Sequence, residues 1–299
     1  MSIITVRNLT KRFGNFTALN GIDLDVKQGE VFGFIGPNGA GKSTAIRILL
    51  GILKATGGEA KIFGKDVWHD AVEIHRRIAY VPGDVNLWPN LTGGEVIDLL
   101  VRLRGASHRS RREEFIERFD LDPTKKCATY SKGNRQKVAL IAAFASDAEL
   151  YILDEPTSGL DPLMERVFQE CIAEVKAQGK TVFLSSHILS EVERLCDRVS
   201  IIRQGKIIET GSLQELRHLT RTNVVVQTAR SIPSLAEMEG VHDLQETERG
   251  LSFQVDAEQL GDVIAYISQY DIISLECAPP TLEDLFLHHY EEAGGAESC

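Results

Sequence analysis

A glycine-rich segment followed by a lysine and two hydroxyl side chains carries the clearest chemistry in this sequence. Its spacing is GxxxxGK[ST], in which glycines allow backbone N–H groups to surround phosphate oxygens. Lys42 would reach the terminal phosphates, and Ser43 would ligate Mg²⁺. We therefore predict a nucleoside triphosphate site. Its phosphate-binding residues are Gly36, Pro37, Asn38, Gly39, Ala40, Gly41, Lys42, Ser43 and Thr44.

A second chemical pattern is an apolar run at residues 150–153 that ends in two adjacent carboxylates, Asp154 and Glu155. Asp154 would hold Mg²⁺ through its water shell, and Glu155 would polarise the attacking water as a general base. An ordinary acidic loop after a strand is the alternative interpretation. The phosphate-binding segment elsewhere in the chain favours the catalytic one.

Apolar and alternating patterns indicate the elements that must position these residues. The run at residues 31–35 is typical of a fully buried strand, and the following pattern predicts a helix over residues 44–53. Residues 3–7 and 22–26 alternate between apolar and polar, which predicts an N-terminal antiparallel layer. We expect an α/β fold with a mainly parallel sheet. Its further strands are expected at residues 150–153, 181–185 and 199–203.

Two more regions complete the predicted organisation. Val96, Leu99, Leu100 and Leu103 share one helical face, which indicates a helical subdomain inserted over about residues 86–146. Strand and helix signals restart near residue 220 and resemble a small split-βαβ domain. We therefore predict a domain over residues 1–219 and a small α+β domain over residues 220–299. In the second domain we expect strands at 223–228, 251–255 and 272–277, and helices after the first strand, at 257–269 and at 281–290.

Three more segments, taken with the two motifs above, give the chain a family resemblance. The phosphate-binding segment and the two carboxylates, together with residues 130–136, residues 158–161 and His187, resemble the ordered motifs of an ABC-family nucleotide-binding domain. The resemblance covers about residues 1–215. The resemblance implies a P-loop NTPase fold and ATP hydrolysis with Mg²⁺. It assigns Lys42, Glu155 and His187 to catalysis, with His187 contacting the γ-phosphate and positioning the catalytic carboxylate.

The same resemblance implies that each ATP site is completed by a second subunit. Ser131, Gly133 and Asn134 match the family's signature and would contact ATP held by the opposite subunit, while Asp161 belongs to the loop that crosses the dimer interface. A hydroxyl and an amide at a helix start suit anionic oxygens, although alone they are equally a plausible helix cap. Phe13 matches the aromatic residue that stacks on adenine; an isolated aromatic would more often be core.

The chain departs from the family pattern at two places. Gly83 occupies the position of a glutamine that usually binds Mg²⁺, and we hypothesise that Asp84 or a water takes over this role. In the signature, Lys132 replaces the first glycine and Asn134 replaces the glutamine. Lys132 would either add positive charge at the partner's nucleotide or face solvent.

Composition restricts the compartment and the partners. The net charge of −10 and pI near 5.4 argue against affinity for nucleic acid. Five scattered cysteines without CxxC spacing suit thiols of a reducing cytoplasm rather than a disulfide framework or zinc site. No stretch approaches the about 18 uninterrupted apolar residues of a spanning helix. We expect a cytoplasmic protein, held at the inner face of the membrane by a permease subunit on another chain.

The C-terminal sequence bears on what the predicted ATPase would drive. From residue 223 onwards it resembles the tail of ATPase subunits of bacterial drug, antibiotic and lipid exporters, so we expect export, with a homodimer favoured over a paralogous pair. The tail is either a packing module or a dimerisation or regulatory element. A non-transport ABC ATPase would usually carry tandem nucleotide domains or long coiled coils, which are not visible here. A domain that only binds ATP is disfavoured because Glu155 and His187 are intact.

Overall fold

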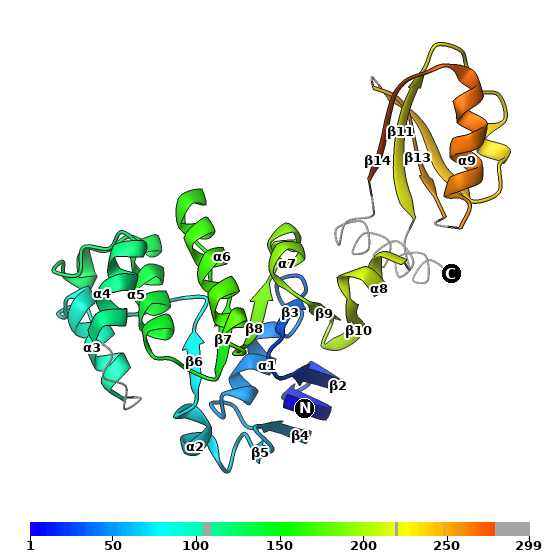
Figure 1. Ribbon diagram of the computed structural model, residues 1–299. Helices are drawn as coiled ribbons and strands as arrows, with labels where there is room; N and C mark the ends of the chain where they lie inside the picture. Colours follow the sequence, from blue (N-terminus) through cyan, green and yellow to red (C-terminus); the bar gives the residue numbers. More distant parts are fainter. Residues whose placement is uncertain (104–108, 219–220, 248, 257, 279–299) are drawn as a thin grey trace. The chain divides into compact units, whose positions relative to one another are not determined.

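The computed structural model describes residues 1–103, 109–218, 221–247, 249–256 and 258–278 (Figure 1). The chain divides into two compact units, Met1–Thr210 and Gly211–Cys299, which are described separately below. The helix predicted at residues 281–290 lies outside the described residues. Within the described ranges, no helix combines the length and the apolar character needed to cross a membrane.

The first unit begins with the antiparallel layer that the alternating pattern predicts. Strands β1 (Ser2–Phe13) and β2 (Phe16–Lys27) form a hairpin, and β4 (Gly57–Ile62) and β5 (Lys65–Asp66) extend the sheet in the order β2-β1-β4-β5. The strands are longer than the alternating segments because the pairing continues to the exposed hairpin tip. Their inward-facing side chains join the core of the unit, among them Ile4, Val6, Leu19, Leu24 and Ile62.

A six-stranded sheet forms the centre of the first unit, with the order β10-β9-β3-β8-β7-β6. The strands from β9 to β6 in this order are mutually parallel. All carboxyl ends of these parallel strands therefore meet at one edge, where ligands of such sheets bind. The strands are β3 (Val31–Ile35), β6 (Ile78–Val81), β7 (Leu150–Asp154), β8 (Thr181–Ser186), β9 (Arg198–Arg203) and β10 (Lys206–Ser212).

The helix after β3 is shorter than predicted. Helix α1 covers Lys42–Leu49, whereas the sequence pattern indicated residues 44–53. The helix stops because Gly51 adopts a left-handed backbone with φ 64°, and the N–H of Ile52 bonds back to the carbonyl of Arg47 at 3.0 Å. This arrangement is a Schellman motif, which a glycine at this position favours. The helix also begins two residues earlier, directly after Gly41.

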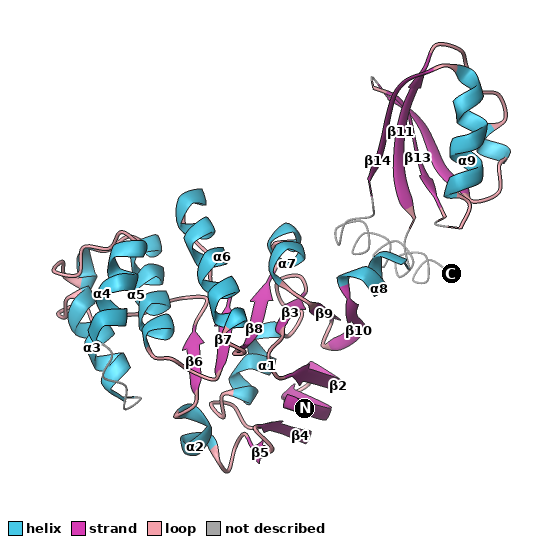
Figure 2. Cartoon of the chain, in the orientation of Figure 1, coloured by secondary structure: helices cyan, strands magenta, loops and turns pink. Residues whose placement is uncertain are grey.

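The inserted helical part is built from α3 (Gly93–Leu103), α4 (Arg109–Arg118) and α5 (Lys132–Ala145), which gather beyond β6 (Figure 2). The ring of Phe144 joins it to the sheet, because it contacts four aromatic rings. These rings belong to Phe115, Phe119, Tyr151 and Phe168. Helices α2 (Ala71–His75), α6 (Pro162–Ala177) and α7 (Leu189–Leu195) complete the unit.

The second unit contains the three predicted strands and a fourth, in the order of a split-βαβ domain. After α8 (Leu213–His218), its four strands form an antiparallel sheet in the order β12-β13-β11-β14, and the apolar side of α9 packs on it. Strand β13 thus lies between β11 and β12, and β11 lies between β13 and β14, as in a split-βαβ arrangement. The elements are β11 (Thr222–Thr228), η2 (Leu235–Glu237), β12 (Val241–Thr247), β13 (Gly250–Val255), α9 (Leu260–Ile267), η3 (Ser268–Tyr270) and β14 (Ile272–Ala278).

Three details of this unit differ from the prediction. The short helix expected after the first strand is only the 3₁₀ turn η2, and strand β12 was not predicted. Strand β12 lies at the sheet edge, where most of its residues are exposed or half-buried, so it lacks a clear apolar alternation. Helix α9 covers only part of the residues 257–269 that the pattern indicated.

Candidate functional site

Three segments with predicted chemistry leave the same edge of the central sheet. Ile35, the last residue of β3, pairs with Ser186 at the end of β8, and Ser185 pairs with Asp154 at the end of β7. The glycine-rich loop, His187 and Glu155 follow these strand ends directly in the sequence. The parallel register therefore explains why residues distant in the chain come together.

Two glycines of the loop are required by close backbone approach. A Cβ at Gly36 would lie 2.2 Å from the carbonyl oxygen of Ile202, and one at Gly41 would lie 2.8 Å from that of Ala18. Gly41 also has φ 113°, a conformation that L side chains rarely adopt. The loop then enters α1, whose N-terminal N–H groups favour an anion. This backbone is suited to surround phosphate oxygens.

Lys42 is the buried cation of this loop, with only 5% of its side chain exposed. Its ammonium group donates to the carbonyl oxygens of Gly36 at 2.6 Å and Pro37 at 3.2 Å. Burial lowers the pKa of Lys42, and the neighbouring carboxylates Glu155 and Asp154 oppose that shift. The ammonium is thus held at the loop itself, 3.8 Å from a carboxylate oxygen of Glu155.

The remaining loop residues differ in exposure. Asn38, Gly39 and Ser43 are exposed, so their polar groups are open to a ligand. Pro37 and Thr44 are half-buried, and Ala40 is buried against Gly36. The predicted phosphate-binding segment therefore contains both residues that a ligand can reach and buried residues that pack beneath them.

The carboxylates Asp154 and Glu155 point to different partners. Asp154 is buried, and its Oδ1 accepts a hydrogen bond from the Ser185 hydroxyl. Glu155 adopts a left-handed backbone with φ 46°, and its N–H donates to the Ser185 carbonyl at 3.0 Å. Its Oε1 lies 3.2 Å from Nδ1 of His187 and 3.8 Å from Nζ of Lys42. The structure thus brings the three predicted catalytic side chains together.

The residues at the glutamine position lie beside the same edge. A Cβ on Gly83 would lie 3.3 Å from the carbonyl oxygen of Asp154, so the loop after β6 runs close to the end of β7. The side chain of Asp84 is exposed, and its Oδ2 accepts a hydrogen bond from Asn86 at 3.4 Å. Gly83 permits this close backbone approach, and Asp84 supplies an accessible carboxylate next to it.

The signature residues form the first turn of α5. Ser131 is the N-cap, and its hydroxyl accepts from the N–H of Asn134 at 3.2 Å. Gly133 lies so close to the next motif that a Cβ there would meet the Gly159 carbonyl oxygen at 2.4 Å. The ammonium of Lys132 donates to Ser158 at 2.6 Å. Lys132 is exposed, as one of its two alternatives expected, and within one chain it contacts the 158–161 loop.

Two predicted residues lie at exposed element ends. Asp161 is the N-cap of α6, where its side chain accepts from the N–H of Met164 at 3.0 Å. Phe13 lies at the tip of the β1–β2 hairpin opposite Phe16, is 49% exposed, and has the ammonium of Lys11 4.9 Å from its ring centroid. An exposed flat ring is available for stacking.

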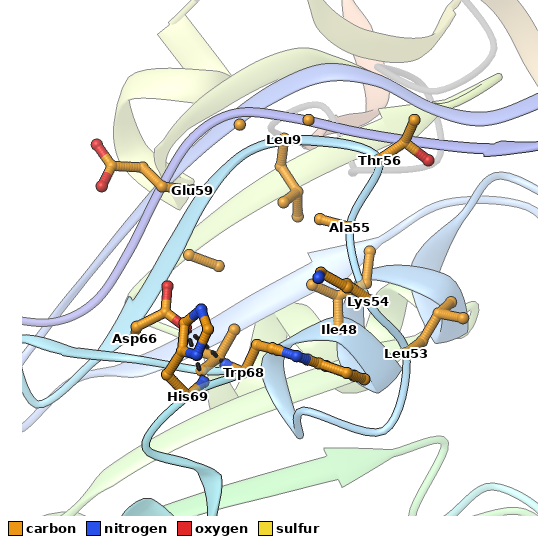
Figure 3. Close-up of a pocket in the computed structure, with 14 residues that line it drawn as sticks. Leu9, Ile48, Leu53, Lys54, Ala55, Thr56, Glu59, Asp66, Trp68 and His69 are labelled. Atoms are coloured by element: carbon orange, nitrogen blue, oxygen red, sulfur yellow. Dashed lines mark hydrogen bonds between the residues drawn. The ribbon is translucent and has the colours of Figure 1, made fainter.

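A cavity of about 190 Å³ lies at the other end of α1 (Figure 3). Leu9, Ile48, Leu53 and Trp68 are among its lining residues, and the lining includes no predicted site residue. Helix α1 rises about 1.5 Å per residue, so Ile48 is about 9 Å along the helix from Lys42. The cavity and the predicted chemistry are therefore separate features.

Sequence reasoning missed several buried polar residues behind the site. Ser185 orients Asp154, Ser186 bonds to Glu191, and the amide of Gln136 donates to the Pro156 carbonyl at 2.9 Å. Ser185 ends the strand predicted at residues 181–185, and Ser186 lies between it and His187, so their position was an available signal. Glu191 and Gln136 are in helical segments with ordinary polar patterns, which did not indicate their burial.

The fold and site define a P-loop nucleoside triphosphatase: a parallel sheet, a glycine-rich loop entering a helix with a buried lysine, and two carboxylates on a neighbouring strand end. Comparison with families agrees with this class. Residues 19–158 match the ABC transporter family, and residues 211–290 match the ATP-binding protein DrrA1-3-like, C-terminal domain.

Several relatives extend over nearly the whole chain. The daunorubicin resistance ATP-binding protein DrrA3 of Streptomyces coeruleorubidus is 35% identical, with 95% of each chain covered. The bacitracin transport ATP-binding protein BcrA of Bacillus licheniformis is 32% identical, with 96% of each chain covered. The uncharacterised ABC transporter ATP-binding protein YhaQ of Bacillus subtilis is 34% identical over 95% of this chain and 97% of its own.

Solved structures resemble a large part of this chain. An ATP-binding subunit of an ABC transporter superposes with a TM-score of 0.68 at 33% identity, covering 73% of this chain and 92% of that chain. A dimeric cassette, MJ0796 bound to ADP and Pi, has a TM-score of 0.64 at 28% identity, covering 70% and 98%. The chain belongs to the ATP-binding proteins of ABC transporters, and it is an ATPase.

Proposed function

We propose that this ATPase powers export through a membrane-spanning subunit on another chain. Two relatives that cover nearly the whole chain are named for bacitracin transport and daunorubicin resistance, which supports a drug-like or antibiotic cargo. The protein would act at the cytoplasmic face of the membrane, held there by its partner. We propose an ATP-binding domain over residues 1–219 and an accessory domain over residues 220–299. The division of the chain supports two domains, but it falls between Thr210 and Gly211, earlier than this proposed boundary.

The observation that carries the proposed chemistry is the meeting of Lys42, Glu155 and His187 at one sheet edge. ATP would lie with its phosphates in the loop, where backbone N–H groups and Lys42 stabilise negative charge. Glu155 would accept a proton from the attacking water. His187, 3.2 Å from Glu155, would orient that carboxylate and contact the γ-phosphate.

The oxygen groups near the loop suit Mg²⁺, which prefers hard oxygen ligands. Ser43 is exposed beside Lys42, and Asp154 is buried with one oxygen fixed by Ser185. We propose that both hold Mg²⁺, whose chemical contribution when bound is to neutralise phosphate charge. Asp84 is the proposed substitute for the missing glutamine. Asp84→Ala should then raise the Mg²⁺ concentration needed for half-maximal hydrolysis; an unchanged Mg²⁺ dependence would exclude this role.

We further propose a dimer, with two identical subunits favoured, in which each chain completes the other's ATP site. Ser131 and Gly133 are at the start of α5, where a hydroxyl, an amide and the helix end favour anionic oxygens. Asn134 would contribute to the same contact, and Asp161 lies exposed at the start of α6. Phe13 would stack on adenine. The dimeric MJ0796 cassette supports this arrangement.

Replacing Glu155 with glutamine tests the proposal because it removes the base but keeps the shape. We expect Glu155→Gln to reduce hydrolysis at least ~100-fold, the scale of losing a general base, and to give a stable ATP-dependent dimer. The measurements are phosphate release and light scattering with and without ATP. A variant that stays monomeric at saturating ATP would contradict the two-chain site, whereas retained hydrolysis would contradict the role of Glu155.

A further inference from the structure

Glu191 is a buried carboxyl group that the proposed reaction does not use. It lies on α7, and only 5% of the residue is exposed. Its Oε2 accepts a hydrogen bond from the Ser186 hydroxyl at 2.8 Å, while its Oε1 is buried and makes no hydrogen bond with the described residues. Burying a carboxyl group is costly, so its retention requires a reason beyond packing.

The hydrogen bond to Ser186 fixes the turn that carries His187. The Ser186 hydroxyl, besides donating to Glu191, accepts from the N–H of Ile188 at 3.0 Å. Ser186 and Ile188 are the two residues that flank His187. Because the same hydroxyl binds Ile188 and is itself held by Glu191, the backbone on both sides of the imidazole is restrained.

Glu191 also lies beside a residue of the loop that follows Glu155. The side chain of Thr157, which is buried, lies beside the Glu191 carboxyl. Thr157 is two residues after Glu155, and its carbonyl accepts from Leu160 at 2.9 Å. Burial raises the pKa of Glu191, and the hydroxyls of Ser186 and Thr157 oppose this. The carboxyl therefore lies between the segments that carry His187 and Glu155.

We propose that Glu191 is a positioning residue that holds the His187 imidazole in register with the Glu155 carboxylate. Its route of action is the hydrogen bond to Ser186, the turn over residues 186–188, and the 3.2 Å contact between His187 and Glu155. In this proposal Glu191 acts only through its hydrogen bond to Ser186. The inference rests on the roles proposed above for His187 and Glu155.

The test is a double-mutant cycle on steady-state ATP hydrolysis by the full chain. Glu191→Leu removes the acceptor for Ser186, and it should lower kcat about 10-fold or more, because small misplacements of catalytic groups are costly. The KM for ATP should change less than about threefold. Glu191→Gln keeps an acceptor oxygen in the same place, so its kcat should stay within about threefold of the parent.

The His187→Ala background separates positioning from general destabilisation. If Glu191 acts through His187, adding Glu191→Leu to His187→Ala should change kcat less than about twofold. Equal losses in both backgrounds would overturn the inference. No loss from His187→Ala alone would instead overturn the proposed role of His187, so the two failures are distinguishable.

Two further variants cover the case in which Glu191→Leu does not fold. Ser186→Ala deletes the same hydrogen bond from the other side with a minimal change in volume, and it should lower kcat by a similar factor. Glu170→Leu makes the same carboxyl-to-leucine change at an exposed position on α6, and it should leave kcat unchanged. If Ser186→Ala hydrolyses ATP at the parental rate, the inference fails.

Discussion

The two compact units of this chain differ in what they bury. The unit Met1–Thr210 buries polar groups such as Lys42, Asp154 and Glu191 among its apolar side chains, most of them close to the sheet edge with the proposed chemistry. In the described part of the second unit, no polar or charged side chain is buried to the same degree; its core holds residues such as Phe253 and Val224. Burying polar groups costs free energy, and this cost occurs near the proposed chemistry of the first unit but is not seen in the described part of the second unit.

The largest expected effect tests whether the second unit is only a packed core. Phe253 is almost fully buried there among Val224, Val263 and Ile267. Phe253→Ala should lower the local free energy of unfolding by about 3–5 kcal/mol. Hydrogen exchange of the β11 and β13 amides in the full chain measures this. ATP hydrolysis should stay within about threefold; a parallel loss would show that the unit has a dimerisation or regulatory role.

Lys42→Ala should have the opposite effect to Phe253→Ala: a large loss of ATP hydrolysis with no loss of stability in the second unit. Deleting one preorganised charge donor typically costs about 10²–10³-fold in rate, equivalent to about 2.7–4 kcal/mol. We expect that loss in kcat for ATP, with hydrogen exchange in the second unit unchanged. Phosphate release is the measurement. Hydrolysis within tenfold of the parent would remove Lys42 from the proposed catalytic set.

A matched pair of glycines compares the two units directly. Gly133 and Gly261 are each the second residue of a helix, α5 and α9. A Cβ at Gly133 would lie 2.4 Å from the Gly159 carbonyl oxygen, whereas one at Gly261 would meet nothing within 4 Å. Gly133→Ala should therefore displace the signature turn and lower kcat roughly 10-fold.

Gly261→Ala, in contrast, should stabilise the second unit by about 0.5–1 kcal/mol and leave kcat unchanged, because alanine is the better helix former. Denaturant titration of the full chain, followed by hydrogen exchange in α9, checks this. Similar outcomes for both glycine variants would mean that the close approach at Gly133 has no catalytic consequence.

The smallest effect concerns acid stability of the second unit. Hydrogen bonds from His242 and Arg221 lower the pKa of Asp256 below its ordinary value of 3.8. A lowered carboxyl pKa contributes stability above 3.8, and this contribution is lost as the pH falls through the folded-state pKa. Asp256→Asn should cost about 0.2–1 kcal/mol at neutral pH, as exposed pairs do. Calorimetry should show this difference shrinking below 3.8; a constant difference would contradict the pairing.

Local sequence patterns predicted those elements and motifs whose structure is determined by one short segment of the chain. The buried strand Val31–Ile35 and the loop into α1 are examples, because burial and glycine spacing are both local signals. Strand β12 could not be predicted, since its exposed edge position leaves no apolar alternation. The burial of Glu191 depends on Thr157, which is far earlier in the chain, as well as on the nearby Ser186, and no local pattern encodes the contact with Thr157.

The left-handed backbone of Glu155 has a consequence for laboratory evolution. A non-glycine residue at φ 46° stores about 1–3 kcal/mol of strain, which glycine would largely relieve. A library screened for heat resistance alone would therefore enrich glycine at position 155 and discard the proposed general base. Selection for thermostability in this chain must be coupled to a turnover assay, or it will yield robust but inactive proteins.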